Sequence, residues 1–296
     1  MDNVSQLPTV GPIHEPAPGI SERIEVLTRV CVDELLDAFG LGRGRRLLEP
    51  LCRVPAKRLA RQVATYDEIV GESGLAAGGA WALERMVRRV EVEGRENIPP
   101  EGPLLLVANH PGLADSIALF AAVPRRDLRV VAAERPLLKA LPNTSRHLMS
   151  VPEASQGRLG VFRSAVRHLK RGGAVLTFPG GKIEPDPALL PGAIEALERW
   201  SGSLDLFARY VPGLTVVPAT VSGVLSSTAL RNPLILVRRR RCDREWLAAT
   251  MQMLTPALRN VTTRVAFGHP VRAGEGTVRE TTLDEMRRLI ERCKAG

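Results

Sequence analysis

The feature that most constrains the fold is a series of short apolar runs that begins at residue 104 and alternates with segments of helical periodicity. Most runs are apolar at consecutive positions, which predicts strands buried on both faces. Such strands are typical of sheets covered by helices on each side. The sequence therefore predicts an α/β fold with a mixed, largely parallel sheet flanked by helices. The expected strands are 104–108, 128–133, 147–151, 174–178, 214–221, 234–237 and 264–268.

Helical patterns fill the intervals between these strands and most of the first ninety residues. The first helix is expected to begin with Ser21 as its N-cap and to end at Gly40. A second, basic stretch is broken by Pro50 and Pro55, and a third, rich in Gly and Ala, is expected to run into a strand near residue 93. The later helices are expected at 115–123, 156–171, 190–200, 243–259 and 283–293.

The change of pattern near residue 93 suggests how the chain is divided. A length of 296 residues with 44% apolar content allows one large α/β domain with an appendage. The proline-rich N-terminus indicates a loose arm. We therefore expect a flexible arm at 1–19, a helical N-terminal subdomain at 20–93 and an α/β domain at 94–296.

The chain is basic, with 41 Lys and Arg against 32 Asp and Glu and a formal net charge of +9. Such a surplus suits an anionic partner. Nucleic acid is not expected, because aromatic residues make up only 4% and no stacking motif accompanies the basic runs. The basic stretches 43–61 and 237–246 fit either an anionic membrane surface or a solvated face.

Cysteine and histidine are sparse. The four cysteines form no C-x-x-C pair and the five histidines form no ligand pair, so the sequence predicts neither a disulfide framework nor a metal site, and no cofactor. No secretory leader and no apolar run of about 18 residues is present, which predicts a cytoplasmic protein with at most peripheral membrane contact. The oligomeric state stays open.

The stretch "NHPGLAD" places His110 and Asp115 directly after an expected buried strand. Residues five apart point in different directions on a regular helix, but Pro111 and Gly112 break the backbone between them. Asp115, in the first helical turn, can then hold one ring nitrogen of His110 and leave the other free as a general base. The spacing alone favours the simpler interpretation, a structural histidine beside a helix-capping aspartate.

A second motif, "FPGGKIEPD" at 178–186, also follows an expected buried strand. Gly180 and Gly181 would let backbone amides approach an anion, and Lys182 would supply positive charge. Taken alone the segment fits a tight turn. In a parallel sheet, however, both loops would lie at the carboxyl edge, where α/β folds bind ligands.

Together these residues resemble the glycerolipid acyltransferases, which include lysophosphatidic acid acyltransferases and soluble chloroplast glycerol-3-phosphate acyltransferases. "NHPGLAD" resembles the family's N-H-x-x-x-x-D block and "FPGGKIEPD" its phosphate-binding block, usually F-P-E-G-x-R. "VVPATVSG" at 216–223 and "RVAFGHPV" at 264–271 resemble two later blocks. The resemblance covers about residues 90–296.

The resemblance implies an O-acyltransferase of the 1-acylglycerol-3-phosphate type, acting in phospholipid synthesis. It would move an acyl group from an acyl-CoA or an acyl carrier protein to a hydroxyl of a glycerol-phosphate or lysophospholipid acceptor. His110 would be the base and Asp115 its partner. The resemblance implies an acceptor phosphate site at Pro179, Gly180, Gly181 and Lys182, with Arg158 or Arg163 replacing an indistinct middle block at 147–155, and supporting roles for Asn109 and Pro218.

Two positions depart from the family pattern. Gly180 stands where the pattern has Glu, and Glu184 stands where the chloroplast type has a second Arg. The competing functions are a thioesterase or esterase, which would release free fatty acid without an acceptor, and a non-catalytic peripheral lipid-binding relative, whose function would survive loss of His110.

Overall fold

The computed structural model describes residues 18–41, 45–152, 157–272 and 277–295. Within them, eight strands form one sheet in the order β1-β7-β6-β2-β5-β3-β4, with β8 paired to β6. The mixed α/β fold predicted from the apolar runs is confirmed. The strands are β1 (Arg89–Glu93), β2 (Leu104–Ala108), β3 (Arg129–Ala133), β4 (Leu148–Val151), β5 (Ala174–Thr177), β6 (Thr215–Ser222), β7 (Thr262–Phe267) and β8 (Val271–Arg272).

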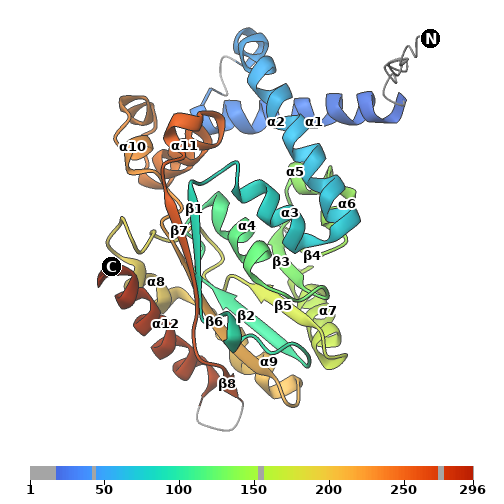
Figure 1. The fold of residues 1–296 in the computed structure, drawn as a ribbon, viewed down its shortest axis with the longest axis vertical. Helices are drawn as coiled ribbons and strands as arrows, with labels where there is room; N and C mark the ends of the chain where they lie inside the picture. Colours follow the sequence, from blue (N-terminus) through green and yellow to red (C-terminus); the bar gives the residue numbers. More distant parts are fainter. Residues whose placement is uncertain (1–17, 42–44, 153–156, 273–276, 296) are drawn as a thin grey trace, which may run out of the picture.

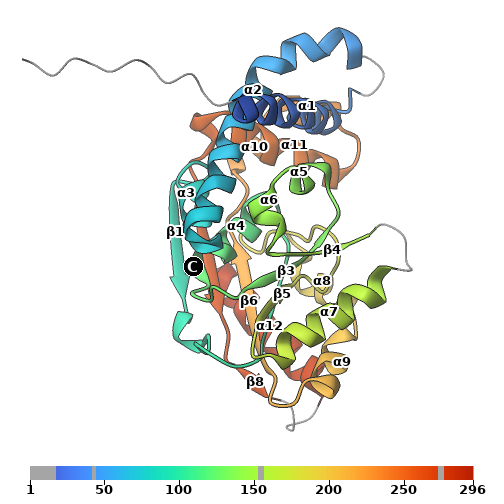
Figure 2. The ribbon, with the colours of Figure 1, turned by 90° about the vertical axis from the view of Figure 1, so that its right-hand side faces the viewer.

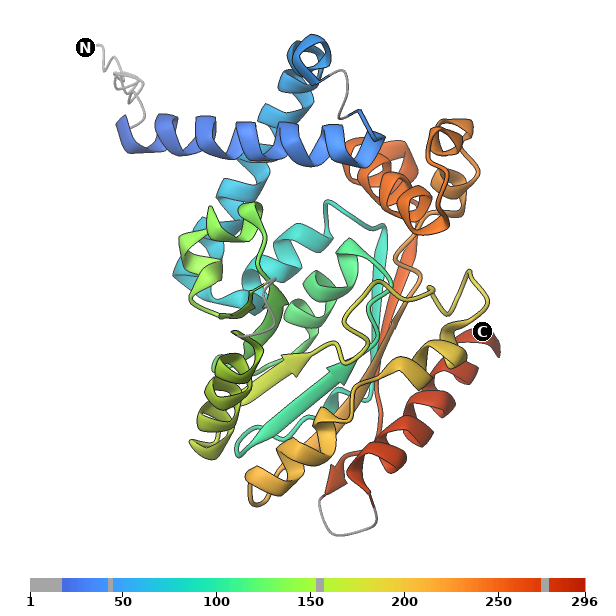
Figure 3. The ribbon, with the colours of Figure 1, turned by 180° about the vertical axis from the view of Figure 1, so that it is seen from behind.

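Five neighbouring strands, β6, β2, β5, β3 and β4, run parallel. β7 and β8 run antiparallel to β6, and β1 runs parallel to β7. In Figure 3 the arrows of β2 and β5 point toward the half of the molecule that carries the N-terminal helices. The carboxyl edge of the parallel strands therefore faces that half.

The central strand β2 is buried at all five positions because each of its faces packs against a different helical layer. Leu104, Leu106 and Ala108 join a core with residues of α1 to α4. Leu105 and Val107 join a second core with residues of α7, α8, α9 and α12. This two-sided burial explains the continuous apolar runs. The helices of both layers are α1 (Pro18–Phe39), α2 (Arg45–Ser73), α3 (Leu75–Leu83), α4 (Leu113–Ala122), α7 (Arg158–Lys170), α8 (Ala193–Ala196), α9 (Ser203–Tyr210) and α12 (Val278–Ala295).

Eight further helical segments complete the described chain. They are η2 (Arg95–Asn97), α5 (Pro136–Lys139), α6 (Pro142–Ser145), η4 (Leu197–Arg199), α10 (Ser227–Leu230), η5 (Pro233–Val237), α11 (Arg241–Leu254) and η6 (Pro256–Leu258). The first of these follows β1, and α5 with α6 connects β3 to β4 (Figure 1).

Three sequence expectations are wrong in detail. Ser21 is not a helix cap, because α1 already begins at Pro18, a residue whose fixed φ suits a first helical turn. Pro50 and Pro55 do not end their helix, since α2 continues through both. Figure 2 shows that α2 is bent along its length, which agrees with the kinks that prolines cause inside helices.

The third correction concerns 234–237, expected as a strand. This run forms the 3₁₀ helix η5, because Pro233 lies in its first turn and the Asn232 side chain accepts a hydrogen bond from the Leu234 N–H at 3.0 Å. The apolar side chains are not buried in the sheet, since Leu234, Leu236 and Val237 are 54–64% exposed. The predicted arm at 1–19 lies almost wholly outside the described residues, and the domain boundaries stay predictions.

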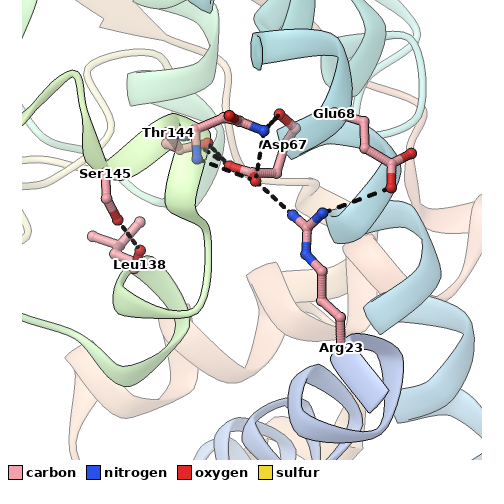
Figure 4. Close-up of polar contacts among 7 residues, drawn as sticks. Arg23, Asp67, Glu68, Leu138, Thr144 and Ser145 are labelled. Carbon is pink, nitrogen blue, oxygen red and sulfur yellow. Dashed lines mark hydrogen bonds and ion pairs between the residues drawn. The ribbon is translucent and has the colours of Figure 1, made fainter. Parts of the chain in front are cut away.

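A buried aspartate fastens the N-terminal helices to the α/β part (Figure 4). The Asp67 carboxylate on α2 accepts the Thr144 backbone N–H and hydroxyl, both at 2.7 Å, and pairs with Arg23 of α1 at 2.5 Å. The Asn143 amide donates to the Asp67 carbonyl at 3.0 Å. One fully buried carboxylate therefore connects α1, α2 and α6, the last of which follows the carboxyl end of β3.

Candidate active site

His110 and Asp115 meet at the carboxyl end of β2, as their spacing with the Pro-Gly break predicted. His110 follows the last strand residues, whereas Asp115 lies in the first turn of α4. His110 Nδ1 lies 2.7 Å from Asp115 Oδ2. Because an ionised carboxylate only accepts hydrogen bonds, the neutral imidazole carries its proton on Nδ1, and Nε2 is left as the basic nitrogen.

Asp115 is held in place by the backbone that surrounds it. Its Oδ2 also accepts the Gly112 N–H at 2.9 Å, and its Oδ1 accepts from the backbone N–H and the hydroxyl of Ser116. The carboxylate is completely buried. A buried charge with several donors keeps a fixed orientation, so Asp115 fixes both the position and the tautomer of the imidazole.

The His110 ring is partly exposed and sits against an aromatic side chain. Its side chain is 29% exposed, and its ring centroid lies 4.7 Å from that of Phe178. Burial would lower the pKa of His110, but the Asp115 carboxylate, by charge and by its hydrogen bond, and the Glu184 carboxylate together raise it above the ordinary value of 6.5. The imidazolium is therefore stabilised at this site.

Asn109 and Pro218 connect the His110 loop to the neighbouring strand β6. The buried Asn109 amide brackets Val221, donating to its carbonyl at 2.9 Å and accepting its N–H at 2.7 Å. Pro218 is buried and lies opposite Val107 in the sheet register. Both residues therefore support the loop from below, and neither is exposed enough to contact a large ligand.

The "FPGGK" segment forms a turn after β5, at the same edge of the sheet. Gly181 has φ +64°, and its N–H donates to the Phe178 carbonyl at 3.0 Å. Pro179 is buried, and its carbonyl accepts the Ser201 N–H at 3.2 Å. Lys182 is exposed. Since the Gly181 amide is used within the turn, Lys182 is the candidate best placed to attract an anion.

The two motifs are joined through Glu184. Its backbone N–H donates to the His110 carbonyl at 2.8 Å, and its Oε2 accepts the His110 N–H at 3.0 Å. Its Oε1 accepts the Trp200 indole N–H at 2.7 Å. The position that departs from the family pattern therefore holds the main chain of the candidate base, 74 residues away in the sequence.

Asp186 holds the loop that follows β6. Its fully buried carboxylate accepts backbone N–H groups from Gly223 at 2.9 Å, Val224 at 2.8 Å and Ala188 at 3.0 Å. Burial raises the pKa of Asp186, and these backbone donors oppose the rise. The loops after β2, β5 and β6 are thus bound to one another by buried acid and amide side chains.

The structure does not bring every candidate together. Arg158 and Arg163 are exposed on α7, and in the described residues neither forms a hydrogen bond or ion pair with His110 or Lys182. Glu153, in the expected middle block, lies outside the described residues. The contacts of Glu184, Trp200 and Asp186 were not predicted from the sequence. The available signal was a pair of acids in the proline-rich segment "KIEPDP" directly after a buried strand.

The arrangement can accept a proton at an exposed edge and stabilise the resulting positive charge. His110 Nε2 is the basic atom, Asp115 and Glu184 are the nearby negative charges, and Lys182 is an exposed cation on the adjoining turn. Such a set can activate a hydroxyl or a water molecule and needs no covalent intermediate. The same geometry serves acyl transfer to an alcohol and hydrolysis.

Comparison with known proteins narrows this choice. Residues 89–222 match the family model described as Acyltransferase. One similar solved structure is the 1-acyl-sn-glycerophosphate (LPA) acyltransferase PlsC from Thermotoga maritima, at 18% identity and a TM-score of 0.46, covering 94% of this chain and 97% of that one. A search of curated proteins gave no match. The family match spans His110, Asp115 and the "FPGGK" turn, and residues 89–222 of this chain therefore belong to the acyltransferase family.

Proposed function

We propose that the protein is a glycerolipid O-acyltransferase that moves a fatty acyl group from an acyl thioester to a hydroxyl of a glycerol-phosphate or lysophospholipid acceptor. The observation that carries the proposal is the His110–Asp115 pair at 2.7 Å, inside a segment that matches the acyltransferase family. No described residue forms a hydrogen bond with His110 Nε2. The donor is acyl-CoA or an acylated carrier protein, and no further cofactor is required.

The proposed reaction follows from the protonation state of His110. Nε2 removes the proton of the acceptor hydroxyl as its oxygen attacks the thioester carbonyl. Asp115 stabilises the imidazolium that forms. When the carbon–sulfur bond breaks, the imidazolium returns the proton to the departing thiolate. The products are an ester and a free thiol, and His110 is neutral again.

Lys182 is the residue that we propose for attracting the acceptor phosphate. Lys182 is exposed and lies two positions before Glu184, whose backbone N–H donates a hydrogen bond to the His110 carbonyl. A lysine binds phosphate as a point charge, so this site would favour anionic acceptors without fixing their shape. Arg158 and Arg163 form no hydrogen bond or ion pair with this turn in the described residues, and we assign them no part in the acceptor site.

A pocket beside α4 is the candidate site for the acyl chain, and its lining residues lie outside the His110 loop and the "FPGGK" turn. The pocket has a volume of about 310 Å³ and includes Ala118, Ala121 and Ala122 of α4, the helix whose first turn carries Asp115. Leu83 and Val87 contribute further apolar surface. Arg88, Arg89 and Arg95 also line the pocket, together with Glu84.

We expect a cytoplasmic protein that meets its acceptor at an anionic membrane surface. No helix in the described ranges combines the length and apolarity needed to cross a bilayer. On η5, however, Leu234, Leu236 and Val237 are exposed and are followed by the exposed Arg239 and Arg240. Apolar side chains next to arginines suit shallow contact with anionic lipid, each basic residue contributing roughly 1 kcal/mol.

One assay tests the proposal. Purified protein is given long-chain acyl-CoA, or acylated carrier protein, with lysophospholipids, glycerol 3-phosphate and neutral alcohols in turn, and free thiol and ester product are measured. We expect thiol release only with an acceptor, and loss of both products in His110→Ala. Thiol release with free fatty acid and no acceptor would indicate a thioesterase. Activity unchanged by His110→Ala would exclude the mechanism.

A further inference from the structure

Glu184 is a buried carboxylate whose contacts are directed at the main chain of His110. It is 5% exposed and exchanges two hydrogen bonds with the His110 backbone, one through its N–H and one through Oε2. The Trp200 indole occupies the other carboxylate oxygen at 2.7 Å. Placing a charge in the interior is costly, so a carboxylate with both oxygens committed to fixed donors holds those donors firmly.

The carboxylate also occupies the space beside Gly180. A Cβ atom at position 180 would lie 2.4 Å from Glu184 Oε1 and 3.0 Å from its Cδ. No side chain can therefore extend from position 180 while Glu184 keeps its place. Gly180 is also the position at which the pattern F-P-E-G carries its glutamate, and in this chain a carboxylate from four residues downstream lies beside the backbone of that position.

We propose that Glu184 is the positioning residue of this acyltransferase, holding the His110 main chain from position 184 because Gly180 leaves the room to do so. The proposal rests on the function proposed above. Glu184 does not touch the reacting atoms. It acts by fixing where the imidazole lies relative to Asp115, and by adding a negative charge close to the imidazolium that forms during the reaction.

The electrostatic part of this role can be measured. The groups that face the His110 ring are Asp115 from α4 and Glu184 from the turn after β5, while Arg199 acts on Glu184 from η4. Removing the Glu184 charge leaves Asp115 alone to hold up the pKa of His110. The pKa of His110 must therefore fall in Glu184→Gln, and the acidic limb of activity must move to lower pH.

Glu184→Gln is the first test. Glutamine has one acceptor oxygen for two donors, the His110 N–H and the Trp200 indole, so one bond is lost. We expect kcat to fall roughly 10- to 100-fold, with little change in the KM of the thioester. The matched control is Glu285→Gln, another buried glutamate that accepts a histidine backbone N–H, from His269 at 3.0 Å. It should leave kcat and the acidic limb unchanged.

Relocating the carboxylate is the second test. Gly180→Glu alone should lower activity, because the new side chain collides with Glu184. Glu184→Ala alone should lower activity because the His110 N–H and the Trp200 indole lose their acceptor. The double variant Gly180→Glu with Glu184→Ala should be at least tenfold more active than Glu184→Ala, as rescue by a residue that replaces the missing carboxylate. A double variant no better than Glu184→Ala would overturn the proposed relocation.

An NMR titration of the His110 imidazole separates this inference from the proposed function, because it needs no turnover. We expect the His110 pKa to fall in folded Glu184→Gln and to stay constant in Glu285→Gln. An unchanged His110 pKa in a folded Glu184→Gln protein would overturn the positioning role even if the enzyme is active. Absence of acyl transfer in the wild-type protein with the expected pKa change would instead overturn only the proposed function.

Discussion

Two glutamates in this protein make the same local contact at different places in the sheet. Glu184 accepts the His110 N–H at 3.0 Å, and Glu285 of α12 accepts the His269 N–H at 3.0 Å. Each glutamate also fills the space beside a glycine, Gly180 in one case and Gly268 in the other. The first pair lies beyond the carboxyl end of β2. The second lies between β7 and β8, beside the middle of β6, where the Gly268 N–H donates to the Pro218 carbonyl at 2.8 Å.

The difference lies in what happens to the histidine ring. The His269 side chain is 81% exposed, and its Nδ1 is 3.6 Å from Glu285, too far for a good hydrogen bond. The His110 ring is held by Asp115 at 2.7 Å and packs against Phe178. A glutamate that accepts only the backbone N–H therefore leaves an ordinary surface histidine. The histidine becomes a candidate base where a second acid, Asp115, also holds its ring.

The largest expected effect comes from breaking the hydrogen bond between Asp115 and the His110 ring. Asp115→Asn should lower kcat by about 10³- to 10⁴-fold, because an amide at this position no longer selects the tautomer with a free Nε2. Steady-state thiol release checks the prediction, with circular dichroism to verify the fold. A loss of less than tenfold would mean that Asp115 only caps α4.

The next effect concerns pH and distinguishes the two histidines. Because the pKa of His110 is raised above 6.5, its base form is lost as pH falls through a value above 6.5, and kcat/KM should decline on that side. Linkage gives stability the opposite trend. The raised pKa stabilises the folded protein below pH 6.5, and this contribution is lost as pH rises through the folded pKa. A pH–rate profile with its acidic limb below 6.5 would contradict the assignment.

Removing the second glutamate should affect stability and not catalysis. Glu285→Ala leaves the His269 N–H without its buried acceptor and empties the space beneath Gly268, at a cost of about 1–3 kcal/mol. Thermal unfolding measures the loss. We expect the variant to keep the wild-type kcat at a temperature where it is folded. A large fall in kcat would show that the Glu285–His269 contact and the Glu184–His110 contact are not independent.

The smallest effect is expected from His269 itself. His269→Ala removes an exposed ring and keeps the backbone N–H that Glu285 binds. We expect a change within about 0.5 kcal/mol in the free energy of unfolding and no change in kcat. A stronger effect in either measurement would mean that the two histidines are more alike than their surroundings indicate.

The sequence was most informative where one residue pattern has one physical solution. Runs that are apolar at consecutive positions need burial on both faces, and β2 was predicted at its observed bounds, 104–108. The run at 234–237 has the same composition but became η5, since an apolar run does not say whether a sheet position is free for it. The His110–Asp115 contact was predictable because the Pro-Gly break and both side chains lie within six residues.

The contacts that the sequence could not reveal join distant positions through the backbone. Glu184 accepts hydrogen bonds from a main-chain N–H and from an indole N–H. Neither donor can be recognised in a sequence as the partner of an acidic side chain. The position of Glu184 therefore looked like a departure from an anion-binding pattern. Lys182 was expected at the site and lies on the adjoining turn, whereas the choice of Arg158 or Arg163 rested only on their place along the chain.

The buried Asp67 carboxylate has a consequence for how the protein unfolds. Its donors come from α1 and α6, and the helices α1 and α2 share one apolar core with β2 and β3. Detaching the N-terminal helices would leave Asp67 and Thr144 without their partners and uncover that core. The helices and the sheet should therefore melt together as one cooperative unit, and the 89–222 segment that matches the family is not expected to fold in isolation.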